Sequence, residues 1–385
     1  MSPSQSSDSG DIASAVDLPA AAAEGEAGGA GLYIHIPFCS SICPYCDFAV
    51  RRGGEESVRR LISTLLREIE ALAEAEALPE APPLASAVST LVKERFDTIY
   101  FGGGTPSLVG DRDLERILSA LGRHLDIDPE ARLFFEANPE HVSPERVAAW
   151  RELGVKTLSL GVQALDDRAL GFLGRGHDTR EALRAIEIAR EGGFATLSVD
   201  LIYGLPDQTE VGWDRQLEIV LDQRLDHLSL YELEIHGRTD FGRRFARGEL
   251  DPLAEDARAA LFLATHERMI AAGWDGYEVS SFARRRENRS QHNGKYWRHV
   301  PYLGLGPSSH SLAVDPDFGL WRYWNERLEP RWRRQVEAGR SPAEGWERLS
   351  PSAIALEMAM LGLRTRDGLD LSRMLEMTDI DLLAK

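Results

Sequence analysis

Residues 38–48 read Phe-Cys-Ser-Ser-Ile-Cys-Pro-Tyr-Cys-Asp-Phe and contain all three cysteines of the chain, Cys39, Cys43 and Cys46. Their spacing is C-x3-C-x2-C. Thiolates packed this closely favour a soft metal, because sulfur ligands select iron–sulfur clusters, zinc or copper(I). A 4Fe–4S cluster held by only three cysteines keeps one iron without a protein ligand. The stretch therefore predicts a cluster with one iron open to a small molecule.

Three other interpretations of the cysteines have less support. Structural zinc takes four protein ligands, and with no second C-x2-C pair the fourth would have to be a histidine or a carboxylate. Three unrelated buried thiols would not be expected to cluster so tightly. A disulfide framework needs an even number of cysteines in a secreted protein.

The cysteine spacing, with Tyr45 just before the third cysteine, resembles the motif of the radical S-adenosylmethionine (SAM) superfamily. This resemblance implies that the amino and carboxylate groups of SAM bind the open iron. It also implies that an electron from the cluster cleaves a carbon–sulfur bond of SAM to give a 5′-deoxyadenosyl radical.

Length and composition limit the other possibilities. The 385 residues allow two or three domains, or one barrel of about 250 residues with an appendage. A net charge of −18 argues against nucleic acid as a partner, because phosphate binding needs clustered Lys and Arg. Residues 1–30 are rich in Ser, Ala, Gly and Asp and have no aromatic residue, which predicts disorder.

The sequence also bears on location. No Lys or Arg precedes Arg51, so the pattern of a signal or transit peptide is missing. No apolar run reaches the length of about 18 residues that a membrane span needs. We expect a cytoplasmic protein with reduced thiols and no membrane span, for which peripheral contact with a membrane surface stays open.

Apolar strand-like runs alternate with helical patterns through the first part of the chain. The clearest helical pattern runs from Val58 to Leu72 with i, i+3, i+4 spacing, and residues 78–85 look like a loose linker. Ser143 and Thr179 are the expected N-caps of two later helices. The strand-like runs are Leu32–Ile36, Asp97–Phe101, Leu133–Glu136, Thr157–Leu160, Leu197–Ile202 and His227–Leu233.

Six strands alternating with helices predict an α/β fold with parallel pairing, and a partial (β/α)6 barrel fits both this count and the resemblance. In such barrels the active site lies at the carboxyl ends of the strands. Glycine-rich and polar residues follow the predicted strands at that rim. The most distinct set is Gly102–Pro106, whose glycines allow close backbone approach to a ligand.

The GGGTP segment, together with Glu136–Pro139, Gly161–Gln163 and Asp200–Pro206, resembles one radical SAM family. It contains the oxygen-independent coproporphyrinogen III oxidases and the related haem chaperones. The similarity runs from about Tyr33 to the end of the chain. The resemblance implies SAM contacts at Tyr33, Tyr45, Gly103, Gly104, Thr105, Glu136, Gln163, Arg175 and Asp200.

Two functions of that family compete. One is decarboxylation of the propionates of coproporphyrinogen III; the other is binding haem and delivering it to apo-proteins, with apo-haemoproteins of the respiratory chain as implied recipients. The oxidases resemble C-x3-C-x2-C-x-C, but Phe48 stands in place of the fourth cysteine. His292-Asn-Gly-Lys-Tyr-Trp297 matches the H-N-x-x-Y-W motif of the chaperones. We therefore expect a chaperone without oxidase activity; a radical SAM enzyme acting on another tetrapyrrole is a further alternative.

His292 is the expected haem ligand, because Asn293, Tyr296 and Trp297 offer a hydrogen-bond partner and aromatic surface. The alternative is that this motif only packs a loop against the barrel. His310, in a glycine-containing segment, competes for the role, and His35 is expected in the barrel core or rim.

The expected organisation places a radical SAM barrel at residues 31–250 and a family-specific region for substrate or haem at residues 251–350. Residues 351–385 would begin a smaller α-rich, winged-helix-like C-terminal domain. Relatives usually continue further, so this domain is either shortened here or the chain is a fragment.

Overall fold

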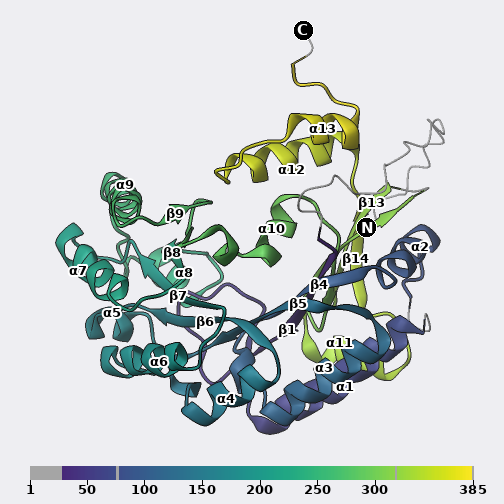
Figure 1. The fold of residues 1–385 in the computed structure, drawn as a ribbon, viewed down its shortest axis with the longest axis horizontal. Coiled ribbons are helices and arrows are strands. Elements are labelled where there is room, and N and C mark those ends of the chain that lie inside the picture. The colour runs from purple at the N-terminus through teal and green to yellow at the C-terminus, as the bar shows by residue number, and fades with distance from the viewer. Residues whose placement is uncertain (1–27, 75–77, 317–318, 384–385) are drawn as a thin grey trace.

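The computed structural model describes residues 28–74, 78–316 and 319–383. A single large twisted sheet runs through the described molecule (Figure 1). Its central strands run parallel, as the partial (β/α)6 barrel predicted from the sequence requires, and the α/β fold is confirmed. These strands are β1 (Ala30–Ile36), β4 (Arg95–Gly103), β5 (Asp126–Ala137), β6 (Val155–Gln163), β7 (Thr196–Tyr203) and β8 (His227–Glu232).

Residues 251–350 extend this sheet at both edges. On the β1 side, β11 (Tyr302–Leu305) pairs parallel with β1, and three antiparallel neighbours follow, β12 (His310–Asp315), β13 (Gly319–Asn325) and β14 (Ala343–Arg348). On the β8 side, β10 (Ser281–Ala283) and β9 (Asp275–Gly276) add antiparallel strands. A separate small sheet pairs β2 (Phe38–Cys39) with β3 (Arg51–Arg52).

Most helices cover the outer, convex face of the sheet, whereas α10, α12 and α13 lie on its inner side (Figure 1). None of the helices in the described ranges is long and apolar enough to cross a membrane. The helices are α1 (Glu55–Ala73), α2 (Pro82–Leu91), α3 (Asp111–His124), α4 (Pro144–Glu152), α5 (Asp167–Phe172), α6 (Thr179–Glu191), α7 (Glu210–Leu221), α8 (Asp240–Ala246), α9 (Glu255–Ala271), α10 (Gln291–Trp297), α11 (Glu329–Glu337), α12 (Pro351–Leu363) and α13 (Leu371–Thr378), with short 3-10 turns η1 (Pro106–Leu108), η2 (Pro139–His141) and η3 (Arg286–Asn288).

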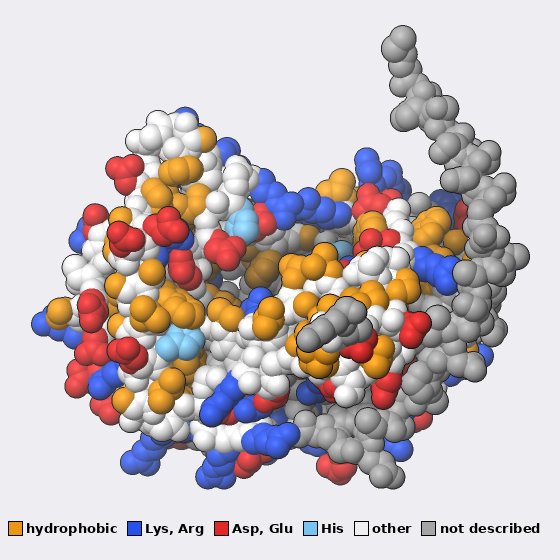
Figure 2. Space-filling view, turned by 90° about the horizontal axis from the view of Figure 1, so that it is seen from above, with side chains coloured by type: hydrophobic (Ala, Val, Ile, Leu, Met, Phe, Trp, Pro, Cys, Tyr) orange, Lys and Arg blue, Asp and Glu red, His pale blue; other side chains and the backbone are white. Residues whose placement is uncertain are grey.

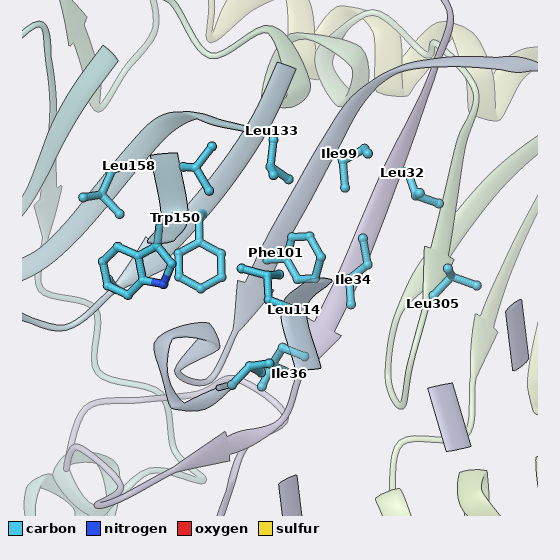
Figure 3. Packing of buried hydrophobic residues seen from close by; sticks show 14 of the residues in the cluster. Leu32, Ile34, Ile36, Ile99, Phe101, Leu114, Leu133, Trp150, Leu158 and Leu305 are labelled. Atoms are coloured by element: carbon cyan, nitrogen blue, oxygen red, sulfur yellow. The ribbon is translucent and has the colours of Figure 1, made fainter. Parts of the chain in front are cut away.

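The core lies between the outer face of the strands and the covering helices (Figure 3). Alternate residues of β1, namely Leu32, Ile34 and Ile36, are 0% exposed. Burial of each such side chain contributes about 1.5–3 kcal/mol. Because side chains alternate along a strand, the remaining positions of β1 point to the inner face of the barrel, where the candidate site lies.

Two local predictions were wrong. The end of the expected linker at residues 78–85 belongs to α2, which begins with Pro82 and Pro83. Proline is tolerated there because the N–H groups of the first helical turn have no acceptor within the helix, so the missing N–H of proline costs no hydrogen bond. The N-cap of α6 is Asp178 instead of Thr179, and it forms a capping box with Glu181. The predicted cap at Ser143 is confirmed, since its hydroxyl accepts from the Arg146 N–H.

The expectation of disorder at the N-terminus lies outside the described residues up to residue 27. The last residue of that expected segment, Ala30, already begins β1. At the other end, residues 351–383 form α12 and α13 and a short tail, above the inner face of the sheet (Figure 1).

Candidate cluster and cofactor site

The cysteine loop leaves the carboxyl end of β1. Cys39 ends β2, and Cys43 and Cys46 follow in the loop that leads to β3; all three thiols are free and partly exposed. The Phe241 N–H donates to the Pro44 carbonyl at 2.9 Å and fastens the loop to α8. On the same side Tyr45 packs its ring against Phe241, with 6.4 Å between the ring centroids.

The three thiols are near enough for the charges of Cys39 and Cys43 to affect the pKa of Cys46. Burial raises the pKa of Cys46 to about 11, and the charges of Cys39 and Cys43 add to this effect. A cation that binds all three sulfurs would remove this penalty, because metal ligands bind as thiolates. No three His, Cys, Asp or Glu side chains of the described chain yet converge into a metal site. The donor set fits an iron–sulfur cluster, for which the loop has to draw the sulfurs together.

Arg175 connects the cysteine loop to the barrel. Its Nη1 donates to Cys43 Sγ at 3.2 Å, while Nη2 donates to Asn138 Oδ1 at 2.8 Å and to the Gly161 carbonyl at 3.0 Å. A guanidinium group with a planar fork of donors suits such a bridge. Its charge would also suit a ligand carboxylate beside the cysteine loop.

The glycines after β4 allow three segments to meet. Gly103 has a φ of +111°, and a Cβ there would lie 2.5 Å from the His35 ring. A Cβ on Gly104 would lie 2.7 Å from the Phe38 carbonyl oxygen and 3.1 Å from Cys39 Sγ. These glycines therefore let the GGGTP segment touch the cysteine loop. Thr105 continues this contact, because its N–H donates to the Phe38 carbonyl at 2.9 Å.

Two carboxyl groups lie inside the barrel. The Tyr100 hydroxyl donates to Glu136 Oε1 at 2.6 Å, and the Ser159 hydroxyl lies 3.2 Å from Asp200 Oδ1. Burial raises the pKa of Glu136 to about 7 and that of Asp200 to about 6. The charge of Asp200 raises the Glu136 pKa further. Such a pair gains from a cationic ligand, and SAM carries a sulfonium and an ammonium group.

Tyr33 and Gln163 complete the predicted set. The Tyr33 hydroxyl lies 3.0 Å from His35 Nδ1, on the inner face of β1. Gln163, the last residue of β6, has a φ of +71°. A non-glycine residue in this left-handed region costs of order 1–3 kcal/mol and is common at ligand sites. All nine predicted SAM contacts thus lie on the inner face of the barrel, at its carboxyl rim or on rim loops.

His292 lies apart from that rim. It sits on α10, its ring is 0% exposed, and both ring nitrogens have partners: Nδ1 is 2.9 Å from Thr98 Oγ1 and Nε2 is 2.8 Å from the Tyr296 hydroxyl. Its ring centroid is 5.1 Å from that of Tyr100. In this arrangement the H-N-x-x-Y-W motif fills the interior of the barrel, and Tyr100 lies between His292 and the carboxyl groups near the rim. Haem ligation by His292 would require both hydrogen bonds to break and α10 to move.

Sequence reasoning missed several residues that shape the site. Tyr100, Ser159 and Ser229 hold the two carboxyl groups, and Ser229 lowers the pKa of Asp200 against the effect of burial. The sequence pattern that could have identified such residues is a polar residue at every second position of an apolar strand, as at Ser198 and Asp200 of β7. In a barrel this pattern marks the inner face.

The fold and the cysteine site define a radical SAM protein. The family model described as the Radical SAM superfamily matches residues 33–215. The fold is similar to that of coproporphyrinogen III oxidase (HemN) from Escherichia coli, with a TM-score of 0.74, 21% identity, and coverage of 91% of this chain and 79% of that chain.

The curated relatives narrow this class. The heme chaperone HemW of Mycobacterium tuberculosis is 34% identical over 349 residues, which cover 89% of this chain and 84% of the relative. HemW of Escherichia coli is 33% identical over 324 residues, covering 81% and 80%. The chain belongs to the HemW family of radical SAM proteins.

Proposed function

We propose that this protein is a haem chaperone that binds haem and transfers it to apo-proteins. The observation that carries the proposal is the 34% identity to a protein named a heme chaperone, over 84% of that relative's length. Identity over this extent includes both the barrel and the sheet extension that follows it.

The alternative is a coproporphyrinogen III oxidase, which the fold likeness alone would allow. Against it stands Phe48, which is 71% exposed on the cysteine loop at the position of the oxidases' fourth cysteine. A phenyl ring offers no ligand or thiol chemistry there. We therefore propose that the decarboxylation activity is absent.

We propose that Cys39, Cys43 and Cys46 hold a 4Fe–4S cluster and that SAM binds beside it. When bound, the cluster would supply an electron to SAM. The protein itself contributes charged side chains to this site. Arg175 lies beside Cys43, and Glu136 and Asp200 lie on the inner face of the barrel. These groups suit the carboxylate and the cationic centres of SAM respectively.

For the cellular role, we propose a cytoplasmic protein that delivers haem to apo-haemoproteins of the respiratory chain. Delivery of this kind would bring the protein into peripheral contact with a membrane surface. The support is the family resemblance in the cysteine, GGGTP and H-N-x-x-Y-W motifs.

One anaerobic experiment separates the two functions. The protein is reconstituted with iron and sulfide, and aliquots are titrated with haem or incubated with coproporphyrinogen III, SAM and a reductant. The proposal expects saturable haem binding and no carbon dioxide release. Decarboxylation at the rate of an authentic oxidase, run in parallel, would overturn it.

A further inference from the structure

The accessibility of the histidines limits which of them can bind haem iron. The chain has ten histidines. In the described structure only His236 and His310 are exposed, and the others are buried or half-buried. An axial ligand has to reach iron at the centre of a flat macrocycle, so an exposed ring is favoured. By this criterion of exposure, His236 and His310 are the two candidate ligands among the described histidines.

The two exposed histidines differ in their partners. His236 Nε2 lies 3.2 Å from Glu234 Oε2 and Nδ1 lies 3.8 Å from Asp47 Oδ2, so both ring nitrogens face carboxylates. His310 forms neither a hydrogen bond nor an ion pair through its ring within the described residues. Partial burial lowers the pKa of His310, and the charge of Arg322 lowers it further. Its ring is therefore neutral at pH 7, as an iron ligand requires.

The surroundings of His310 provide aromatic surface. His310 begins β12 and pairs directly with Trp324 of β13; their rings stack with 5.8 Å between centroids and an interplanar angle of 28°. A Cβ on Gly345 would lie 2.5 Å from the Trp324 ring, so the indole lies flat over β14. A porphyrin stands perpendicular to its axial imidazole. It would therefore meet the edge of the stacked indole as well.

His310 follows Gly306, which packs against β1: a Cβ on Gly306 would lie 2.7 Å from the His35 carbonyl oxygen. His310 acts on buried His35, whose pKa falls to about 4 mainly through burial, with the charge of His310 as a smaller cause. His35 Nε2 in turn lies 3.2 Å from the Ala49 carbonyl of the cysteine loop.

We propose that His310 is the axial ligand of haem and that Trp324 packs against the bound porphyrin. This assignment rests on the proposed haem-binding function and moves the ligand from the buried H-N-x-x-Y-W motif to the exposed surface of the sheet extension. Haem would then sit beside the rim on which the cluster lies. Seen from above the view of Figure 1, the molecule has a hollow bordered by apolar side chains (Figure 2).

Positive charge near this surface suits the propionates of haem. Arg327 is exposed just beyond β13, where the Ser308 N–H donates to the Glu326 carbonyl at 3.0 Å. The Arg327 side chain therefore lies on the segment that contacts the His310 loop. A propionate carboxylate would form a charge-assisted contact with this guanidinium.

The test is an anaerobic haem titration of the full chain, followed through the Soret band. We expect His310→Ala to lose the absorption and electron paramagnetic resonance features of axial histidine and to weaken haem binding by at least about tenfold. Added imidazole should restore the spectrum, which a purely structural role would not allow. His310→Gln keeps the size of the side chain and should behave like His310→Ala.

His236→Ala is the matched control, because it removes the other exposed histidine, and it should bind haem as the wild type does. If the wild type binds haem and His310→Ala retains its spectrum and affinity, the ligand assignment falls while the chaperone proposal stands. If the wild type binds no haem, both fall.

Discussion

Arg175 Nη1 lies 3.2 Å from Cys43 Sγ and ties the cysteine loop to Asn138, just after β5, and to Gly161 within β6. The other guanidinium nitrogen reaches Asn138 and the Gly161 carbonyl, at 2.8 and 3.0 Å. The positive charge is therefore in place at a cysteine before any cluster binds. A guanidinium at this place can face the carboxylate of a ligand that binds beside the cysteine loop.

The first prediction concerns the cluster. Anaerobic reconstitution should load about four irons per chain, with the broad visible absorption of iron–thiolate bonds. The variants Cys39→Ala, Cys43→Ala and Cys46→Ala should each fail to hold a stable cluster, because the two thiolates that remain are too few to bind it. Ser41→Ala changes an exposed residue of the same loop and should assemble normally. A tight stoichiometric zinc site that survives in the cysteine variants would contradict the cluster.

The second prediction concerns SAM. Asp200→Asn should weaken SAM binding to the reconstituted protein by about 1–3 kcal/mol, the usual cost of losing a charged hydrogen-bond partner. Equilibrium dialysis measures the affinity, and the electron paramagnetic resonance of the reduced cluster reports SAM at the iron. Asp207→Asn is the control, because Asp207 is exposed in the loop after the same strand. Equal affinities of the two variants would remove Asp200 from the site.

The third prediction concerns His292. The sequence predicts His292 as the haem ligand, but the burial of its ring leads to a different expectation for His292→Ala. Loss of its bonds to Thr98 and Tyr296 should lower the free energy of unfolding by about 1–3 kcal/mol. The Soret position should stay unchanged. His124→Ala at the end of α3 serves as the control. A shifted Soret band with unaltered stability would restore His292 as the ligand.

The fourth prediction concerns Glu68 on α1. Its carboxylate accepts from the Gly306 N–H at 2.8 Å, from Asn325 Nδ2 at 2.7 Å and from Trp332 Nε1 at 3.1 Å, and so joins the barrel to the sheet extension. Burial raises its pKa from 4.5 to about 7. The folded state therefore holds the proton more tightly than the unfolded state does.

The sign of the pH effect follows from this raised pKa. The stabilising contribution of protonated Glu68 is complete below pH 4.5 and is lost as pH rises to about 7. Glu68→Gln should remove this loss, which amounts to about 3 kcal/mol. Urea unfolding of both proteins on either side of that interval measures the difference. Parallel stability curves of wild type and variant across the interval would show that Glu68 does not titrate there.

The strands and the rim could be predicted because their signals are local. Apolar runs alternate with helical spacing, and the glycine-rich and polar segments follow directly in the sequence. The helix α2 was missed because Pro82 and Pro83 suggest a break, although both fit a first helical turn. The burial of His292 was not predictable, because it depends on Thr98 of β4, far away in the chain. The accessibility of His310 likewise depends on its pairing with Trp324.

The transfer of haem to an apo-protein is the decisive measurement for a haem chaperone. Reconstituted protein loaded with one equivalent of haem is mixed with an excess of an apo-haemoprotein, and the Soret band of the recipient is followed over time. We predict saturable haem binding followed by a rise of the recipient's holo-spectrum, faster than from a haem-loaded protein such as serum albumin. Failure to bind haem, or retention of haem with no transfer to any apo-haemoprotein tested, would contradict it.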